Sequence, residues 1–169
     1  MKTLAYLMIL GMLCAVFLGG CAKATPEPTG ETINPGDKIG DFLVKTGDES
    51  VFANDDDTTC SKQGEGEKYL CEAPVGKDVI VSNGIYDDQY NGKLDELWSN
   101  HTYEMTINDR PVNLKAFGPI DRQHPTVGMM RYWNVVIRAD KPGEITVHSK
   151  GVVGGDPFED TTTYSFVAP

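Results

Sequence analysis

The stretch TYEMTI, residues 102–107, alternates polar and apolar side chains at every step. Because successive side chains of a β-strand point to opposite faces, Tyr103, Met105 and Ile107 would share one face. One apolar and one polar face are typical of a strand that lies between a core and solvent. The stretch therefore predicts a half-buried β-strand.

The same period of two recurs through most of the chain after residue 40. In residues 131–138, RYWNVVIR, it places Trp133, Val135 and Ile137 on one face of an expected strand. Turn-forming residues such as Asn91-Gly92 separate the runs. Further short strands are expected at residues 41–45, 78–82, 144–148 and 163–168.

Helical spacing is expected only in residues 92–99, GKLDELWS, where Leu94, Leu97 and Trp98 lie at positions i, i+3 and i+4. Many short strands without alternating helices indicate an antiparallel sandwich or barrel. We therefore expect an all-β fold, a single antiparallel immunoglobulin-like β-sandwich with one short helix, over residues 35–169. This length matches the usual size of one domain with one core.

The first twenty residues have a different character from the rest of the chain. Residues 4–18 are an apolar run, preceded by one charge at Lys2 and followed by Gly19-Gly20. A membrane-spanning helix needs roughly 20 apolar residues, so this run is short of a span. A positive start, an apolar centre and small residues at the end predict an export signal.

The four residues Leu18-Gly19-Gly20-Cys21 resemble the lipobox of bacterial lipoprotein precursors. The resemblance implies that residues 1–20 are a cleaved signal peptide and that the Cys21 sulfur carries a diacylglycerol. The new amine is then acylated, and two or three acyl chains hold a protein firmly on a membrane. We therefore expect lipid anchoring to the cell membrane or outer membrane, on the extracytoplasmic side.

A second cleavage pattern leaves one alternative open. Ala22-Lys23-Ala24 fits conventional signal cleavage, which would release the protein without lipid. In either case residues 22–34, AKATPEPTGETIN, have the composition of a solvated segment. We expect residues 21–34 to be the lipidated cysteine and a disordered tether.

The charge of the chain limits the partners that it could bind. The formal net charge is −10, and removal of residues 1–20 takes away only one charged residue, Lys2. Nucleic-acid binding needs Lys and Arg to neutralise phosphates, so nucleic acid is not an expected partner. The expected contact with the membrane is through the lipid on Cys21.

Two cysteines remain after the lipidated one, Cys60 and Cys71. Outside the cytoplasm an even pair of this kind predicts a disulfide. The intervening residues 61–70, SKQGEGEKYL, indicate a hairpin-like loop. A zinc site is the alternative, but the ligand spacing that zinc sites use is missing.

The sequence contains no G-x-S-x-G, H-E-x-x-H, Walker or dinucleotide-binding motif. We expect no enzyme activity, no cofactor and no metal. Two acidic clusters offer oxygen atoms of the kind that weak calcium sites use, but solvated loops are the expectation for both. The clusters contain Asp55 and Asp57, and Asp156 and Asp160.

Three aromatic residues, Tyr86, Tyr90 and Trp98, lie close together in the sequence around the turn and the short helix. Exposed Tyr and Trp side chains can stack on sugar rings or anchor a protein partner. They form the candidate binding surface, although Trp98 could instead pack on the core as the apolar face of its helix.

Together these features predict a lipid-anchored protein of the cell envelope. It would display its β-sandwich for binding or for a structural surface role, with an envelope protein or glycan as its partner. Two alternatives stay open: an envelope hydrolase that uses an unidentified pair of carboxylates, and an accessory subunit of a transporter.

Overall fold

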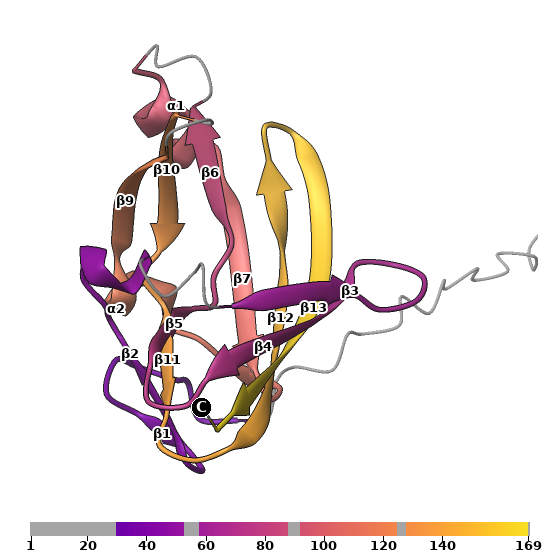
Figure 1. Ribbon diagram of the computed structural model, residues 1–169. Helices are drawn as coiled ribbons and strands as arrows, with labels where there is room; N and C mark the ends of the chain where they lie inside the picture. The colour runs from indigo at the N-terminus through magenta and orange to yellow at the C-terminus, as the bar shows by residue number, and fades with distance from the viewer. Residues whose placement is uncertain (1–29, 53–57, 88–91, 125–127, 169) are drawn as a thin grey trace, which may run out of the picture.

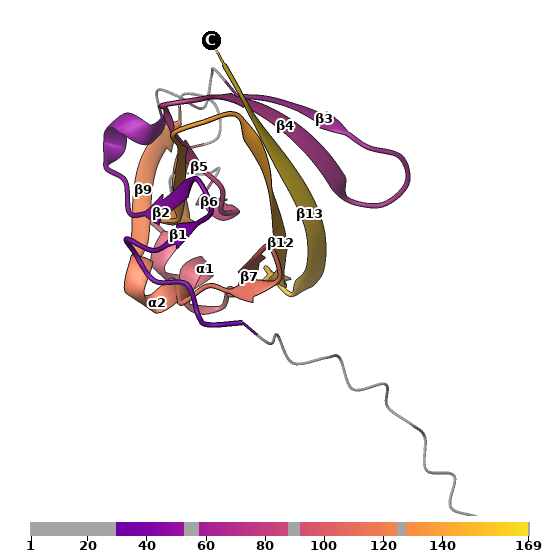
Figure 2. The same ribbon diagram turned by 90° about the horizontal axis from the view of Figure 1, so that it is seen from below.

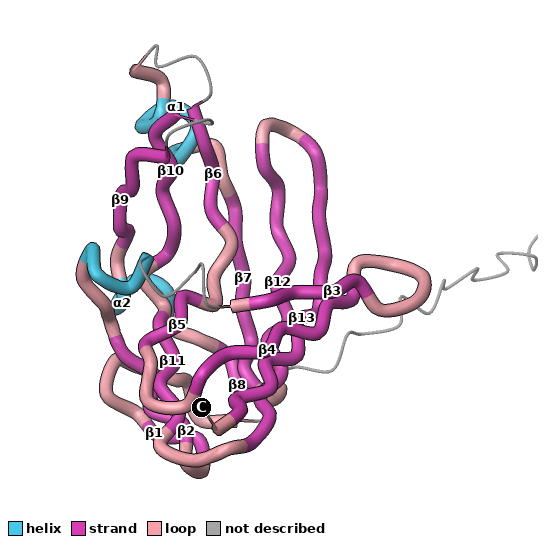
Figure 3. Tube along the Cα trace, viewed as in Figure 1, coloured by secondary structure: helices cyan, strands magenta, loops and turns pink. Residues whose placement is uncertain are grey.

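The structure is a computed structural model that describes residues 30–52, 58–87, 92–124 and 128–168 (Figure 1). Strands account for most of these residues, and the two helices are short (Figure 3). The largest sheet has the order β3 (Thr59–Lys62), β4 (Lys68–Pro74), β13 (Asp156–Val167), β12 (Gly143–Val153), β7 (Thr102–Ile107) and β8 (Arg110–Pro111).

Two smaller sheets and the helices complete the fold. The four-stranded sheet has the order β1 (Lys38–Ile39), β2 (Phe42–Lys45), β11 (Val136–Ala139) and β5 (Asp78–Ile80). The three-stranded sheet has the order β6 (Gly84–Asp87), β10 (Gly128–Trp133) and β9 (Pro119–His124). The helices are α1 (Leu94–Ser99) and α2 (Leu114–Phe117).

The core lies between the six-stranded and four-stranded sheets. Figure 2 shows β2 and β9 on one side of the interior and β12 and β13 on the opposite side. The expected faces are confirmed: Met105, Ile107, Ile145 and Val147 are each at most 3 % exposed and belong to one core cluster. The all-β sandwich is thus the observed architecture, whereas its immunoglobulin-like detail stays a prediction.

One strand pair departs from the antiparallel arrangement expected from the sequence. β4 runs parallel to β13, with partners from Lys68↔Thr161 to Pro74↔Val167. The two strands are far apart in the chain, so no turn constrains their relative direction. Local alternation predicts that a segment is a strand, but it does not predict which distant strand pairs with it.

The β12–β13 hairpin is longer than the sequence suggested. Its ladder extends from Gly143↔Phe166 to Val153↔Asp156, and Gly154 and Gly155 turn the chain with φ of 61° and 96°. Two residues with positive φ are what a tight hairpin turn requires. The acidic residues Asp156 and Asp160, expected in a loop, therefore lie on β13.

The folded part also begins earlier than residue 35. Ile33 is fully buried, and its backbone joins the chain on both sides of Val112. The Ile33 N–H donates to the Pro111 carbonyl at 2.8 Å, and the Asn113 N–H donates to the Ile33 carbonyl at 2.9 Å. The expected boundary at residue 34 is wrong, because an isolated apolar residue in a polar segment fills a core position.

The expected strand over residues 131–138 is divided into β10 and β11 at Asn134 and Val135. The cross-strand register does not change at the break, since Tyr132 faces Gly84 and Val136 faces Ile80. Trp133, Val135 and Ile137 all pack in the same core cluster, as predicted. Their shared face is confirmed, although the strand is interrupted.

Asn134 stabilises the break with its side chain. It is only 9 % exposed, and its Nδ2 donates to the Gly47 carbonyl while its Oδ1 accepts from the Gly47 N–H, both at 2.9 Å. The side chain amide thus pairs with a backbone as a neighbouring strand would. Asn134 connects the segment after β2 to the junction of two sheets.

Asn134→Ala should destabilise the fold strongly, because it leaves both Gly47 groups without their partner in a mostly buried position. We expect a loss of about 2–4 kcal/mol in the free energy of unfolding. Urea denaturation followed by circular dichroism measures it. Asn100→Ala removes an exposed amide that donates to the Glu96 carbonyl at 3.1 Å, and should cost about 0.5 kcal/mol or less. Equal losses in both variants would contradict this role of Asn134.

Candidate functional site

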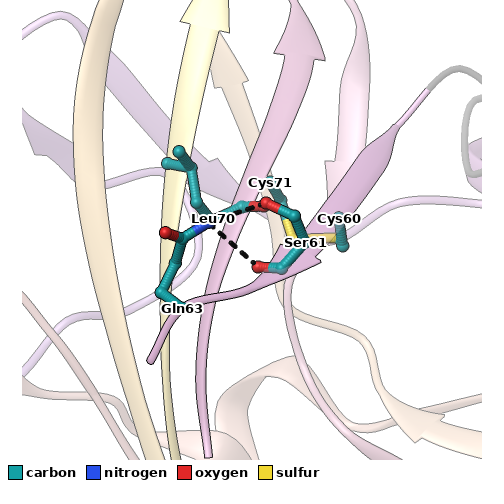
Figure 4. Close-up of a disulfide and its surroundings, with 5 residues drawn as sticks. All are labelled: Cys60, Ser61, Gln63, Leu70 and Cys71. Atoms are coloured by element: carbon teal, nitrogen blue, oxygen red, sulfur yellow. Dashed lines mark hydrogen bonds between the residues drawn. A yellow bond between two sulfur atoms is a disulfide. The ribbon is translucent and has the colours of Figure 1, made fainter. Parts of the chain in front are cut away.

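The predicted disulfide is confirmed. Cys60 on β3 and Cys71 on β4 are bonded and lie directly opposite each other in the antiparallel ladder (Figure 4). The hairpin expected between them is also present. Cys60 is exposed, whereas Cys71 is 2 % exposed. The two sulfur atoms of one bond thus have different surroundings.

Several of the predicted site residues lie outside the described residues: Cys21, Tyr90, Asp55 and Asp57. The described part of the chain holds no helix that is long and apolar enough to cross a membrane. Within the same ranges, no group of three or more His, Cys, Asp or Glu side chains is arranged to hold a metal ion.

The structure does not bring Tyr86 and Trp98 onto one surface. Tyr86 on β6 is 56 % exposed, while its neighbours Ile85 and Asp87 are buried on the other face of the strand. The Asp87 carboxylate accepts the Lys93 N–H at 3.2 Å, at the start of α1. Helix α1, which carries Trp98, therefore covers the face away from Tyr86. The expected common surface is wrong for this pair.

Trp98 instead packs inside an aromatic cluster. Its ring centroid lies 4.8 Å from that of Trp133 and 5.4 Å from that of His101. The guanidinium of Arg131 lies 5.8 Å from the Trp98 ring centroid, in cation–π geometry. The interpretation of Trp98 as a residue that packs its helix on the core agrees with these contacts.

Arg131 fixes α1 to the three-stranded sheet. Its Nε and Nη2 donate to the two Asp121 carboxylate oxygens at 2.6 and 2.8 Å, and its Nη1 donates to Asp95 at 2.7 Å. Hydrogen bonds to Asp121 first, and then to Asp95, raise the pKa of Arg131. A guanidinium with a planar fork suits this double contact better than an ammonium would.

The aromatic cluster continues across the inner face of the six-stranded sheet. The ring centroids of His101 and Tyr103 are 5.7 Å apart, and Phe158 stacks on Tyr103 at 5.9 Å. Burial lowers the pKa of His101, and its Nε2 is buried without a hydrogen-bond partner. The Nε1 of Trp133 is also buried without a hydrogen-bond partner. These rings fill the interior beyond the aliphatic core.

A polar group adjoins the stacked rings. The Tyr103 hydroxyl bonds the Ser149 Oγ at 2.9 Å and accepts the Asn83 N–H at 3.0 Å. Burial raises the pKa of Tyr103 to about 12. The Asn83 side chain donates to the Asp160 Oδ2 at 2.5 Å, and burial raises the pKa of this carboxyl group. The group joins β7, β12 and β13 to the segment before β6.

The outer face of the same three strands is hollowed into an open groove of about 440 Å³. Tyr103, Ser149 and Phe166 are buried, and side chains alternate between the two faces along each strand. Six side chains that line the groove therefore point away from the core. They form two rows across β7, β12 and β13, with Gly151 in the row between them. The rows are Thr102, Val152 and Pro157, and Glu104, Lys150 and Glu159.

The two rows differ in chemistry. Thr102, Val152 and Pro157 give one end of the groove a mainly apolar character. At the other end the Lys150 ammonium lies 3.1 Å from the Glu104 carboxylate. His148 in the next outward position lies 2.9 Å from Glu159. The groove thus offers a cation, two carboxylates and apolar surface within three strands.

Gly151 lies in the row between the two outward rows, and a side chain there would point to the inner face. A Cβ atom there would lie 1.9 Å from the Thr102 carbonyl oxygen and 3.0 Å from the Phe158 ring. Only glycine permits such a close approach of two backbones. The groove cannot be predicted from the sequence, because its residues come from three strands and only the pairing of these strands brings them together.

The three histidines of the chain lie in different parts of the fold. His101 precedes β7 inside the aromatic cluster, His124 ends β9, and His148 lies on the outer face of β12.

Comparison with protein-family models, with curated proteins and with solved structures finds no match for this chain.

Asp160→Asn should stabilise the protein at neutral pH. The pKa of Asp160 is raised in the folded protein, so the protonated carboxyl stabilises the fold at pH values below its unfolded pKa, near 3.8. This stabilisation is lost as the pH rises through the pKa of Asp160 in the folded protein. The amide keeps an oxygen acceptor for Asn83 and carries no charge. We expect Tm at pH 7 to rise by about 1–4 °C, and the difference to shrink towards pH 3.

Calorimetry at pH 3, 5 and 7 measures these differences in Tm. The control is Asp156→Asn, which removes one negative charge from an exposed position at the start of the same strand. A similar rise in Tm for both variants at pH 7 would show that net charge, rather than burial of Asp160, is responsible.

Proposed function

We propose that this chain is a bacterial lipoprotein precursor whose mature form is anchored by lipid on Cys21. The mature protein lies at the cell membrane or outer membrane and faces the extracytoplasmic side. Its β-sandwich acts by binding an envelope glycan or protein, without catalysis and without a cofactor. The resemblance of residues 18–21 to a lipobox supports the anchor.

The Cys60–Cys71 disulfide supports an exported location. Disulfides form and persist in oxidising compartments outside the cytoplasm, whereas cytosolic thiols are kept reduced. The exposure of Cys60 strengthens the argument, since a thiol at that position would be in contact with solvent. Ile33, a buried core residue, lies twelve positions after Cys21 in the sequence.

The groove on the outer face of β7, β12 and β13 is the observation that carries the binding role. It is open, it has a floor on regular strands, and it combines an ion pair with apolar side chains. Sites that recognise ligands commonly place a few polar groups on a rigid, partly apolar surface. We therefore propose the groove, in place of the Tyr86 and Trp98 surface, as the contact site.

Cys21→Ser should abolish acylation, because the serine hydroxyl does not replace the sulfur as the lipid acceptor. In a bacterial host the wild-type protein should fractionate with membranes and carry the mass of the lipid, whereas the variant should not. Intact-mass analysis measures both. Cys14→Ser, which changes a cysteine within the signal, should retain the lipid. A wild-type N-terminus at Thr25 without lipid would contradict the anchor.

Lys150→Glu should weaken partner binding, because it replaces the attraction to Glu104 by repulsion and reverses the cation of the groove. We expect retention to fall at least about fivefold, which is on the order of 1 kcal/mol. Co-sedimentation with purified cell-wall glycan, and cross-linking in intact cells for a protein partner, measure it. Lys115→Glu makes the same charge change on α2. Equal loss in both variants would exclude the groove.

A further inference from the structure

The disulfide lies in a part of the molecule that the core does not use. β3 is at the edge of the six-stranded sheet and pairs with β4 alone. All four of its residues are exposed, and among the described residues neither core cluster includes a β3 side chain. In Figures 1 and 2 the β3–β4 turn projects from the body of the molecule.

The hairpin has other contacts that close it locally. The Gln63 N–H donates to the Lys68 carbonyl at 2.8 Å, and Lys62 pairs with Glu67 at 2.6 Å. The Gln63 side chain donates to the Ser61 Oγ at 2.8 Å (Figure 4). All of these groups are exposed, and exposed ion pairs contribute little to stability. Besides the backbone ladder from Thr59↔Glu72 to Lys62↔Tyr69, the disulfide is the covalent link between β3 and β4.

We propose that the Cys60–Cys71 bond is a reversible redox site, open to thiol–disulfide exchange while the sandwich stays folded. Exchange needs access of a thiolate to one sulfur along the bond. Residue Cys60 is exposed and residue Cys71 is buried, so we expect the attack at the Cys60 sulfur. The reductant class is a protein or small molecule with two thiols. This inference does not rest on the groove.

The exchange proceeds in two balanced steps. A thiolate of the reductant attacks the Cys60 Sγ, the bond between Cys60 and Cys71 breaks, and Cys71 leaves as a thiolate that takes up a proton. The second thiol of the reductant then attacks the mixed disulfide and releases the Cys60 thiolate, which is also protonated. The reductant ends as a disulfide, and the protein gains two electrons and two protons.

The structural consequence is confined to the sheet edge. Without the covalent link β3 frays, and the edge of β4 that faces it loses its hydrogen-bond partners. An uncovered strand edge is a template for another strand. The ladder between β4 and β13 stays intact, because Ala73 of β4 and Phe166 of β13 pair with each other and pack in the core cluster, to which β3 contributes no side chain.

Native-state reduction tests the proposal. The full mature protein is treated with dithiothreitol in native buffer, and free thiols are counted by alkylation and mass spectrometry. We expect both cysteines to be labelled while the near-ultraviolet circular dichroism of the aromatic cluster is unchanged. Hydrogen exchange should rise in residues 59–62 and stay slow in β7 and β12. Loss of the aromatic signal together with the disulfide would overturn the proposal.

A destabilised variant separates local access from global unfolding. If reduction requires global unfolding, Asn134→Ala should speed it on the order of 30-fold or more, in line with the larger unfolded population. Local access predicts a rate within about twofold of the wild type. An acceleration of 30-fold would therefore overturn the proposal, and an unchanged rate would support it.

The attacked sulfur is identified with a trapping probe. Thioredoxin that lacks its second active-site cysteine stops at the mixed disulfide, and peptide mapping locates the attachment. We expect attachment to Cys60. Attachment to Cys71, or no attachment under conditions where dithiothreitol reduces the bond, would overturn the assignment of Cys60 as the exchange site for a protein dithiol.

Discussion

The pairing of the Asn134 side chain with the Gly47 backbone is the constraint on which the arrangement of the sheets depends. It lies where β10 ends and β11 begins. β10 pairs with β6 in the three-stranded sheet, and β11 pairs with β5 in the four-stranded sheet. The register is the same on both sides of the break. A buried amide can replace a short piece of ladder only if both its oxygen and its nitrogen find partners, and Gly47 supplies both.

The strand content could be predicted from the sequence because alternation is local. Residues 102–107 form β7 with the expected bounds, and the shared face of Trp133, Val135 and Ile137 was also correct. The parallel pairing of β4 with β13 could not be predicted, because no local signal selects a distant partner. Acidic composition concealed the first half of β13, and α2 is too short to show a helical period.

The candidate site shows the same division between local and distant information. The disulfide followed from counting cysteines, which needs no knowledge of the fold. Tyr86 and Trp98 are close in sequence, yet α1 folds onto the face of β6 that Tyr86 avoids. The groove residues are separated by up to 57 positions, from Thr102 to Glu159, and only the three-stranded ladder brings them together.

The groove and the aromatic cluster occupy the two faces of the same part of the sheet. The aliphatic core reaches Val147 on β12, whereas beyond it the inner face carries Ser149 and Gly151. At this end of the sheet the strands are packed against the stacked Tyr103 and Phe158 rings. They are also held by the hydrogen bonds of Tyr103 with Ser149 and of Asn83 with Asp160. Three paired strands need a hydrophobic face or a packed partner to be stable. The inner rings thus keep the outer groove on a rigid floor, which is the property that a contact surface needs.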